Sequence, residues 1–234
     1  MKYKHKLLYK FASRSRPTKF IDCIENIYIN KRHDNFFILA SLDLDDTTMN
    51  NPEMKAKMKG YDRLYPVFGT SKNKVDAINR DMTLAPEWDV LVNISDDMLF
   101  CAHGFDLTIL DRYQDRLPDG DCLLHFPDQN QGKNCMTMSI MDKKYYERDN
   151  FIYDPRCESL WSDVIAQETG QMRGRYSFLN TIIFHHNHPS FYQCSMDKQY
   201  EKTESWEVRE HDYDVYLRAK KEYDPNNTLP IRPI

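Results

Sequence analysis

The stretch Asn35–Asp46, NFFILASLDLDD, decides the fold of this chain. Its first part is a near-continuous apolar run, which indicates a strand that is covered on both faces of a sheet. Its last part places acidic residues directly after that strand. Trp88–Met98, WDVLVNISDDM, repeats the arrangement of a buried strand followed by acids. The acids at the two strand ends are Asp43, Asp45, Asp46, Asp96 and Asp97.

Around these two strands, apolar runs alternate with segments of helical periodicity. We expect strands at Lys6–Ala12, Asn35–Leu42, Leu64–Gly69, Trp88–Ile94, Cys122–Phe126 and Thr181–Phe184. We expect one helix that begins at Pro17 and others at Asn51–Gly60, Lys74–Met82, Phe105–Arg116, Ser159–Glu168 and Glu204–Tyr223. Strands that alternate with helices predict right-handed βαβ units, and hence an α/β fold with a mostly parallel sheet.

Length and composition fit one globular domain, residues 1–234. The net charge is −4 and 41% of residues are hydrophobic, which argues against disorder and against a protein that grips nucleic acid through its phosphates. No apolar run approaches the ~20 residues of a membrane span, and the polar start lacks a secretory h-region. The six cysteines are scattered without CxxC pairs. We therefore expect a cytoplasmic protein with no transmembrane segment.

The two acidic clusters predict a ligand site. In open α/β sheets, ligands bind beyond the carboxyl ends of the strands, where both clusters are expected to lie. Neighbouring carboxylates repel one another unless a cation or hydrogen-bond donors separate them. A hard divalent metal that carries a phosphorylated ligand would satisfy them, because Mg²⁺ and Mn²⁺ favour carboxylate and phosphate oxygens. The alternative is that these acids only cap helices and form turns.

Basic and imidazole groups are placed near the same edge. The first strand ends in SRSRP, and residues 70–80 follow the third strand, so that arginine and lysine side chains could contact an anion. These side chains are Arg14, Arg16, Lys72, Lys74 and Arg80. The last expected strand leads into HHNHP, whose three histidines suggest metal binding. These are His185, His186 and His188.

In this order, the motifs resemble the nucleotide-sugar glycosyltransferases of the GT-A fold, above all the family 2 type. The resemblance covers Leu7–His188 and rests on FASRSRP, SLDLDD, SKNKVDAIN, NISDDM, WSD and HHNHP. It implies one domain with a mixed, mostly parallel sheet flanked by helices and an irregular C-terminal half. Residues 1–100 would bind the nucleotide sugar, 101–200 would form the acceptor and catalytic half, and 201–234 a C-terminal helix and tail.

The resemblance also implies roles for the side chains that hold the nucleotide. Ser13 and Arg16 would line it, and Asp43 or Asp45 would accept a hydrogen bond from the base edge. Lys74 would lie near the base or the diphosphate. One departure is that Arg14-Ser15 stands where many members have Tyr-Asn.

The second acidic motif and the later motifs would carry the chemistry. Asp96 would contact the ribose, and Asp97 would ligate Mn²⁺ or Mg²⁺ together with His186 or His188. Asp163 matches the carboxylate that deprotonates the acceptor hydroxyl in inverting members. The preceding residue is Ser162 where many members have Glu, and the nearby acids Glu158 and Glu168 leave the choice of base open.

The implied activity is that of a metal-dependent, inverting glycosyltransferase of the hexosyltransferase type. Its donor would be a UDP- or GDP-sugar, and its acceptor a glycan, a lipid-linked sugar, a protein or a modified base. The donor sugar and the oligomeric state stay open.

Two other functions compete with this one. Asp43-Leu44-Asp45-Asp46-Thr47 also matches the Asp-x-Asp-x-Thr motif of haloacid dehalogenase-like phosphohydrolases, in which the first Asp is a nucleophile and the second a general acid. A whole strand and helix precede this motif, and Asp46 stands where that family usually has Gly. The third possibility is a non-catalytic module that binds nucleotide sugars.

Overall fold

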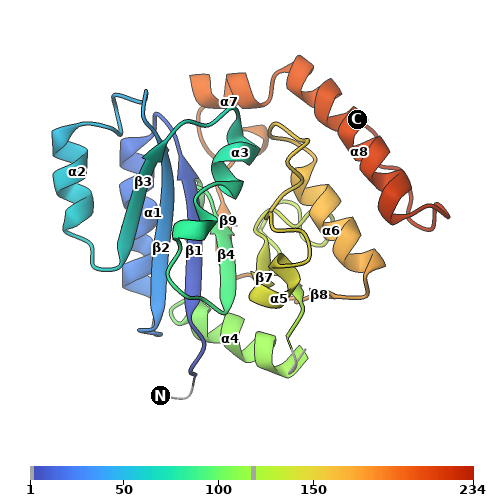
Figure 1. Ribbon diagram of the computed structural model, residues 1–234, viewed down its shortest axis with the longest axis horizontal. Coiled ribbons are helices and arrows are strands. Elements are labelled where there is room, and N and C mark those ends of the chain that lie inside the picture. Colours follow the sequence, from blue (N-terminus) through green and yellow to red (C-terminus); the bar gives the residue numbers. More distant parts are fainter. Residues whose placement is uncertain (1–2, 117–119) are drawn as a thin grey trace.

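A seven-stranded mixed sheet forms the centre of the protein (Figure 1). The computed structural model describes residues 3–116 and 120–234. The strand order is β3-β2-β1-β4-β7-β6-β8. In chain order these strands are β1 (Leu7–Ser13), β2 (Phe36–Asp43), β3 (Leu64–Gly69), β4 (Val90–Ile94), β6 (Leu123–His125), β7 (Ile140–Asp142) and β8 (Tyr176–Phe178).

The first half of the sheet is parallel, as the sequence predicts. β1 lies between β2 and β4, and β2 also pairs with β3, all in parallel register. Ser13 is opposite Leu42, and Asp43 is opposite Gly69, so the carboxyl ends of these strands meet at one edge. This register brings the two acidic clusters to the same side of the molecule.

Helices cover both faces of the sheet. Leu7, Tyr9 and Phe11 of β1 pack into the core beneath α1, α2 and α4, while Leu8 faces the core beneath α3, α5, α6 and α8. The alternation follows from the period-2 direction of strand side chains. The helices are α1 (Pro17–Asn30), α2 (Pro52–Lys59), α3 (Lys74–Asn79), α4 (Phe105–Arg116), α5 (Lys143–Tyr146), α6 (Ser162–Met172), α7 (Lys198–Thr203) and α8 (Trp206–Tyr223).

The second half departs from the expected elements. β7 runs antiparallel to β4 and β6, which makes the sheet mixed. The last strand is β9 (Phe184–His186), three residues later than expected, and it pairs with β5 (Met98–Phe100) in a separate two-stranded sheet. His185 and His186 therefore lie within a strand, and the prediction that they follow one is wrong.

Helix boundaries also differ from expectation at the end of α3, at both ends of α6, which ends at Met172, and at the start of α8, which is Trp206. α3 ends at Asn79, because Arg80 is extended and Asp81 adopts a left-handed φ of 68°. α6 begins at Ser162, three residues late, because Trp161 has a φ of 59° and the preceding loop bonds to another helix. Among the helices of the described ranges, none is long and apolar enough to cross a membrane.

Candidate active site at the carboxyl edge of the sheet

A cavity of about 330 Å³ lies at the carboxyl edge of the parallel strands. Its floor comes from the ends of β1 and β2, the start of α3 and the turn between β4 and β5. Glu158 and Ser159 form part of its wall, and α7 contributes Gln199 and Tyr200. Figure 1 shows α7 above the upper ends of these strands.

Asp96 joins the end of β1 to the turn after β4. Its carboxylate accepts hydrogen bonds from Ser13 Oγ at 2.6 Å and from Arg16 Nη1 at 2.9 Å. Burial raises the pKa of Asp96, Arg16 opposes the rise, and the neighbouring Asp97 adds to it. The structure thus brings together Ser13, Arg16 and Asp96, three residues that the resemblance assigns to the nucleotide.

Asp97, the next residue, is buried beside His186. It accepts hydrogen bonds from Ser95 Oγ and, at 2.6 Å, from the hydroxyl of Tyr200, while His186 Nε2 lies 3.5 Å away. Burial works against the charged form, but His186 and the two hydroxyls hold the pKa of Asp97 below its usual range.

His186 lies between two carboxylates. Its Nδ1 is 3.4 Å from Asp128, on the side away from Asp97. Burial alone would lower the pKa of His186, but Asp128 and Asp97 outweigh burial and raise it to about 9. Asp128 is a site residue that the sequence did not reveal, since no motif surrounds it.

The other two histidines do not contact Asp97. His188 Nε2 is 2.7 Å from Glu204, and its Nδ1 accepts a bond from the Ser190 backbone. The His185 side chain is exposed. Of the three histidines, His186 is therefore the one placed beside Asp97.

The first acidic cluster is held by Arg14. Its guanidinium donates to Asp43 at 2.7 Å and to both oxygens of Asp45, at 2.6 and 2.8 Å. The second oxygen of Asp43, Oδ1, is buried and lacks a hydrogen-bond partner among the described residues. Asp46 instead holds the turn by accepting from the Ser15 backbone, so it has the capping role that the alternative interpretation expects.

Segment 197–204 closes the cavity from the C-terminal side. Asp197 accepts from two nitrogens of Arg16, at 3.0 and 2.8 Å, and the guanidinium lies 3.8 Å above the Tyr200 ring. Lys74 lines the cavity. Burial works against the charged form of Glu204, but His188 and Lys74 hold the pKa of that carboxyl below its usual range. No motif contains Asp197 or Tyr200, so sequence reasoning missed both, although they follow HHNHP closely in the chain.

The donor atoms present fit a metal whose coordination a phosphate completes. Within 3–116 and 120–234, no group of three or more His, Cys, Asp or Glu side chains is arranged to hold a metal ion. Mg²⁺ and similar ions are commonly held by one or two carboxylates together with substrate phosphates and water. Asp97 supplies an oxygen, and His186 supplies a nitrogen once metal binding displaces the proton that the two carboxylates stabilise on its ring, a donor pair suited to Mn²⁺.

The predicted base, Asp163, lies outside the lining of this cavity. It is in the first turn of α6, where its carboxylate accepts from the Val164 backbone and from Cys135 Sγ at 3.0 Å. Burial raises the pKa of the Cys135 thiol, and the nearby Asp163 raises it further. The catalytic role of Asp163 stays a prediction.

Comparisons with known proteins support the architecture. No protein-family model matches the sequence, and no curated protein matches it. Among solved structures, the 1–349 fragment of S. aureus TarS in complex with UDP has 12% sequence identity and a TM-score of 0.64, over 96% of this chain and 67% of that chain. The chain has the GT-A fold.

Two further similar structures contain Mn²⁺ together with a nucleotide ligand. A mannosyltransferase from Pyrobaculum calidifontis, in complex with GDP-Man and Mn²⁺, is 11% identical with a TM-score of 0.61, over 98% of this chain and 78% of that one. Glucosyl-3-phosphoglycerate synthase from Mycobacterium tuberculosis, in complex with Mn²⁺, UDP and phosphoglyceric acid, is 11% identical with a TM-score of 0.60, over 92% and 79%. In this GT-A chain, the acidic cavity lies at the carboxyl edge of the parallel strands.

Proposed function

We propose that this protein is a glycosyltransferase that moves a sugar from a nucleoside diphosphate sugar to an acceptor hydroxyl, with inversion and with Mn²⁺ or Mg²⁺. The observation that carries this proposal is the pairing of Asp96 with Ser13 and Arg16 beside Asp97 and His186, at one edge of a GT-A sheet. The similar structures bind UDP, GDP-Man and Mn²⁺, which supports a nucleotide-sugar donor.

Each group in the cavity has a part in this reaction. Asp43 Oδ1, which accepts no hydrogen bond and lies 3.9 Å from Arg80 Nη2, would accept a hydrogen bond from the base. Asp96, already bonded to Ser13 and Arg16, would contact the ribose through its remaining lone pairs. Arg16 and Lys74 would face the diphosphate with positive charge. A bound Mn²⁺ or Mg²⁺, held by Asp97 and His186, would supply Lewis-acid stabilisation to the departing diphosphate.

We expect the transferred sugar to be a hexose, as in a hexosyltransferase, because the similar structures include a mannosyltransferase and a glucosyl-3-phosphoglycerate synthase. Inverting transfer also needs a general base near the acceptor hydroxyl. The sequence resemblance gives this role to Asp163, and the cavity wall offers Glu158 as a second candidate.

Thermal-shift measurements with UDP or GDP, with and without Mn²⁺, test the donor site. We expect stabilisation of the native protein and its loss in Asp97→Ala. The control is Asp121→Asn, which breaks the ion pairs of Asp121 with the exposed Arg148 and Arg175 away from the cavity and should keep the nucleotide response. Absence of stabilisation by any nucleoside diphosphate would overturn the proposal.

A panel of UDP- and GDP-sugars, assayed for nucleotide release with glycan, lipid-linked, protein and nucleoside acceptors, tests the transfer. We expect release that depends on Mn²⁺ or Mg²⁺. Binding without release from any donor would contradict the enzyme and favour a non-catalytic module that binds nucleotide sugars.

A further inference from the structure

Five carboxylates line the candidate donor cavity, and four of them are engaged. Asp43, Asp45, Asp96 and Asp97 each bond to a guanidinium, hydroxyl or imidazole group. The fifth is Glu158, whose half-buried side chain has no hydrogen bond or ion pair within the described part of the chain. A carboxylate that faces a ligand cavity without a partner keeps its lone pairs available to a bound molecule.

The backbone of Glu158 is held firmly although its side chain is free. Its N–H donates to Asp212 Oδ1 at 2.7 Å, and its carbonyl accepts from the Val75 backbone at 3.1 Å. Asp212 also accepts from the backbones of Ser159 and Leu160, at 2.8 and 2.7 Å. Helix α8 and helix α3 thus fix the position of this residue in the cavity wall from two sides.

The other candidate acids are engaged elsewhere. Glu168 is buried and pairs with Lys220 at 3.2 Å and Arg232 at 2.8 Å, so its carboxylate is part of the core. Asp163 bonds to its own helix and to Cys135 and does not line the cavity. Neither side chain lines the donor cavity, whereas Glu158 does.

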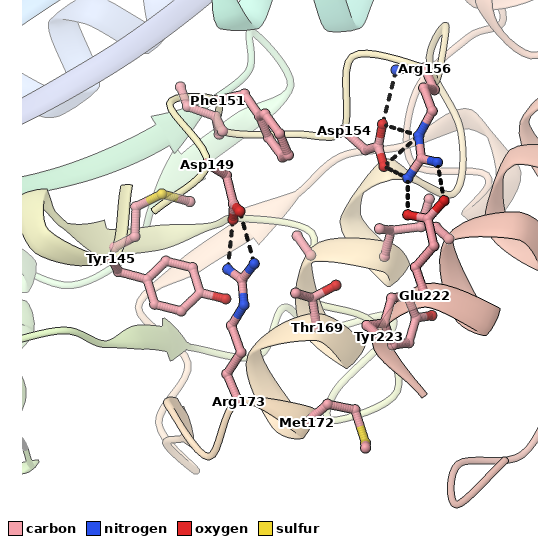
Figure 2. A pocket seen from close by; sticks show the side chains of 15 residues that line it. Tyr145, Asp149, Phe151, Asp154, Arg156, Thr169, Met172, Arg173, Glu222 and Tyr223 are labelled. Atoms are coloured by element: carbon pink, nitrogen blue, oxygen red, sulfur yellow. Dashed lines mark hydrogen bonds and ion pairs between the residues drawn. The ribbon is translucent and has the colours of Figure 1, made fainter. Parts of the chain in front are cut away.

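A second cavity, of about 380 Å³, offers a comparison (Figure 2). It lies between α5, α6, α8 and the loop 149–156, and it shares no lining residue with the donor cavity. Its three carboxylates all face arginines: Asp149 bonds to Arg173, while Asp154 and Glu222 both bond to Arg156. Among the acids that line these two cavities, Glu158 alone has no partner in the described residues.

We propose that Glu158 is the general base of the transfer, a role that rests on the proposed function. Its carboxylate takes the proton from the acceptor hydroxyl as the acceptor oxygen forms a bond to the anomeric carbon. The bond between that carbon and the phosphate oxygen breaks, and its electron pair leaves with the nucleoside diphosphate. Glu158 is left protonated and then returns the proton to water, so the enzyme is regenerated.

The test compares Glu158→Gln with Asp163→Asn in the full-length protein. Nucleotide release is measured with the donor and acceptor that the native protein uses, and UDP or GDP binding with Mn²⁺ is measured by thermal shift. We expect Glu158→Gln to lower kcat by about 10²–10⁴-fold with an unchanged nucleotide-induced shift. Asp163→Asn should lower kcat by less than tenfold.

The pH profile separates a base from a structural role. Native kcat should fall at acid pH as the base is protonated, and this acid limb should disappear in Glu158→Gln. Glu158→Asp, which keeps a carboxylate one methylene shorter, should recover part of the rate. The assignment to Glu158 would be overturned if Glu158→Gln kept a near-native kcat while Asp163→Asn lowered kcat by about 10²–10⁴-fold.

The experiment distinguishes an error in the role of Glu158 from an error in the proposed transferase function. If the native protein releases nucleotide and Glu158→Gln does so at a similar rate, Glu158 is not the base although the transferase activity stands. If the native protein releases nucleotide from no donor, the proposed function fails, and the role of Glu158 fails with it.

Discussion

The hydroxyl of Tyr200 donates a hydrogen bond of 2.6 Å to the carboxylate of Asp97, across 103 positions of sequence. This contact places a side chain of α7 directly on the carboxylate that is the strongest candidate for a metal ligand. The same helix segment engages Arg16 through Asp197. In this arrangement, α7 occupies groups that a metal–diphosphate would also contact.

Replacement of Tyr200 by Phe should therefore tighten the binding of Mn²⁺ with UDP or GDP. Removal of the hydroxyl frees an oxygen of Asp97, and we expect the apparent Kd to fall several-fold. Isothermal titration calorimetry measures the change. Loss of a hydrogen bond to a charged group should also cost about 1.5–3 kcal/mol of stability.

Tyr223→Phe is the matched control for this variant. The Tyr223 hydroxyl donates to buried Glu168 at 2.9 Å, away from the donor cavity. It should lower stability by a similar amount and leave the nucleotide affinity unchanged. Weaker binding in Tyr200→Phe would show that this hydroxyl supports the ligand and does not compete with it.

Replacement of Asp43 by Asn separates a transferase from a phosphohydrolase. In a transferase, this variant loses an acceptor for the base, so the KM for the donor should rise about tenfold while kcat changes little. In a haloacid dehalogenase-like enzyme, Asp43 would be the nucleophile, and hydrolysis of p-nitrophenyl phosphate would be abolished. We expect no such hydrolysis by the native protein. Asp62→Asn, at an exposed aspartate that does not line the cavity, is the control.

Lys10 should make the stability of the protein depend on pH. It is fully buried in β1, and its Nζ lies 2.5 Å from Ser41 Oγ. Burial lowers its pKa to about 7, Asp81 opposes this, and Arg80 adds to it. Between about pH 7 and pH 10 the unfolded chain carries a proton on Lys10 that the folded chain lacks, so rising pH favours the folded state.

The comparison with Lys10→Met isolates this contribution. We expect the unfolding free energy of the native protein to rise relative to that of the variant by about 1 kcal/mol per pH unit from pH 7 to 9. Urea denaturation at several pH values measures both. A constant difference across this range would mean that Lys10 keeps its proton in the folded state.

Replacement of Asp212 by Asn should destabilise the loop that carries Glu158. Asp212 is fully buried and accepts three backbone N–H groups of that loop. An amide keeps one acceptor oxygen and turns its NH₂ group toward a donor, which should cost about 2–3 kcal/mol. Chemical denaturation provides the measurement. The control Asp214→Asn, exposed on the same helix, should change stability by less than about 0.5 kcal/mol; equal losses in the two variants would contradict the role of Asp212.

Much of the first half of the fold could be predicted, because its elements are local. β3 spans the predicted Leu64–Gly69, and α1 begins at the predicted Pro17. The apolar runs in Asn35–Leu42 and Trp88–Ile94 indicate strands that are buried on both faces of a sheet, because a strand with one face in water alternates apolar and polar residues. The second half was harder, since β5, β7, β8 and β9 are three-residue strands whose pairing depends on distant partners.

The sequence alone determined which acids end the parallel strands, since a strand's hydrophobic pattern and its terminal residues are both written locally. The motifs in the sequence also predicted that Ser13, Arg16 and Asp96 contact the same nucleotide. Only the tertiary structure decided that His186 faces Asp97 and that Tyr200 lines the cavity while Asp197 pairs with Arg16. It also decided that Glu158 lines the cavity while Asp163 does not. The reason is physical: these side chains meet through the packing of α7, α8 and β9 against the sheet, and such contacts between distant segments leave no periodic pattern in the chain.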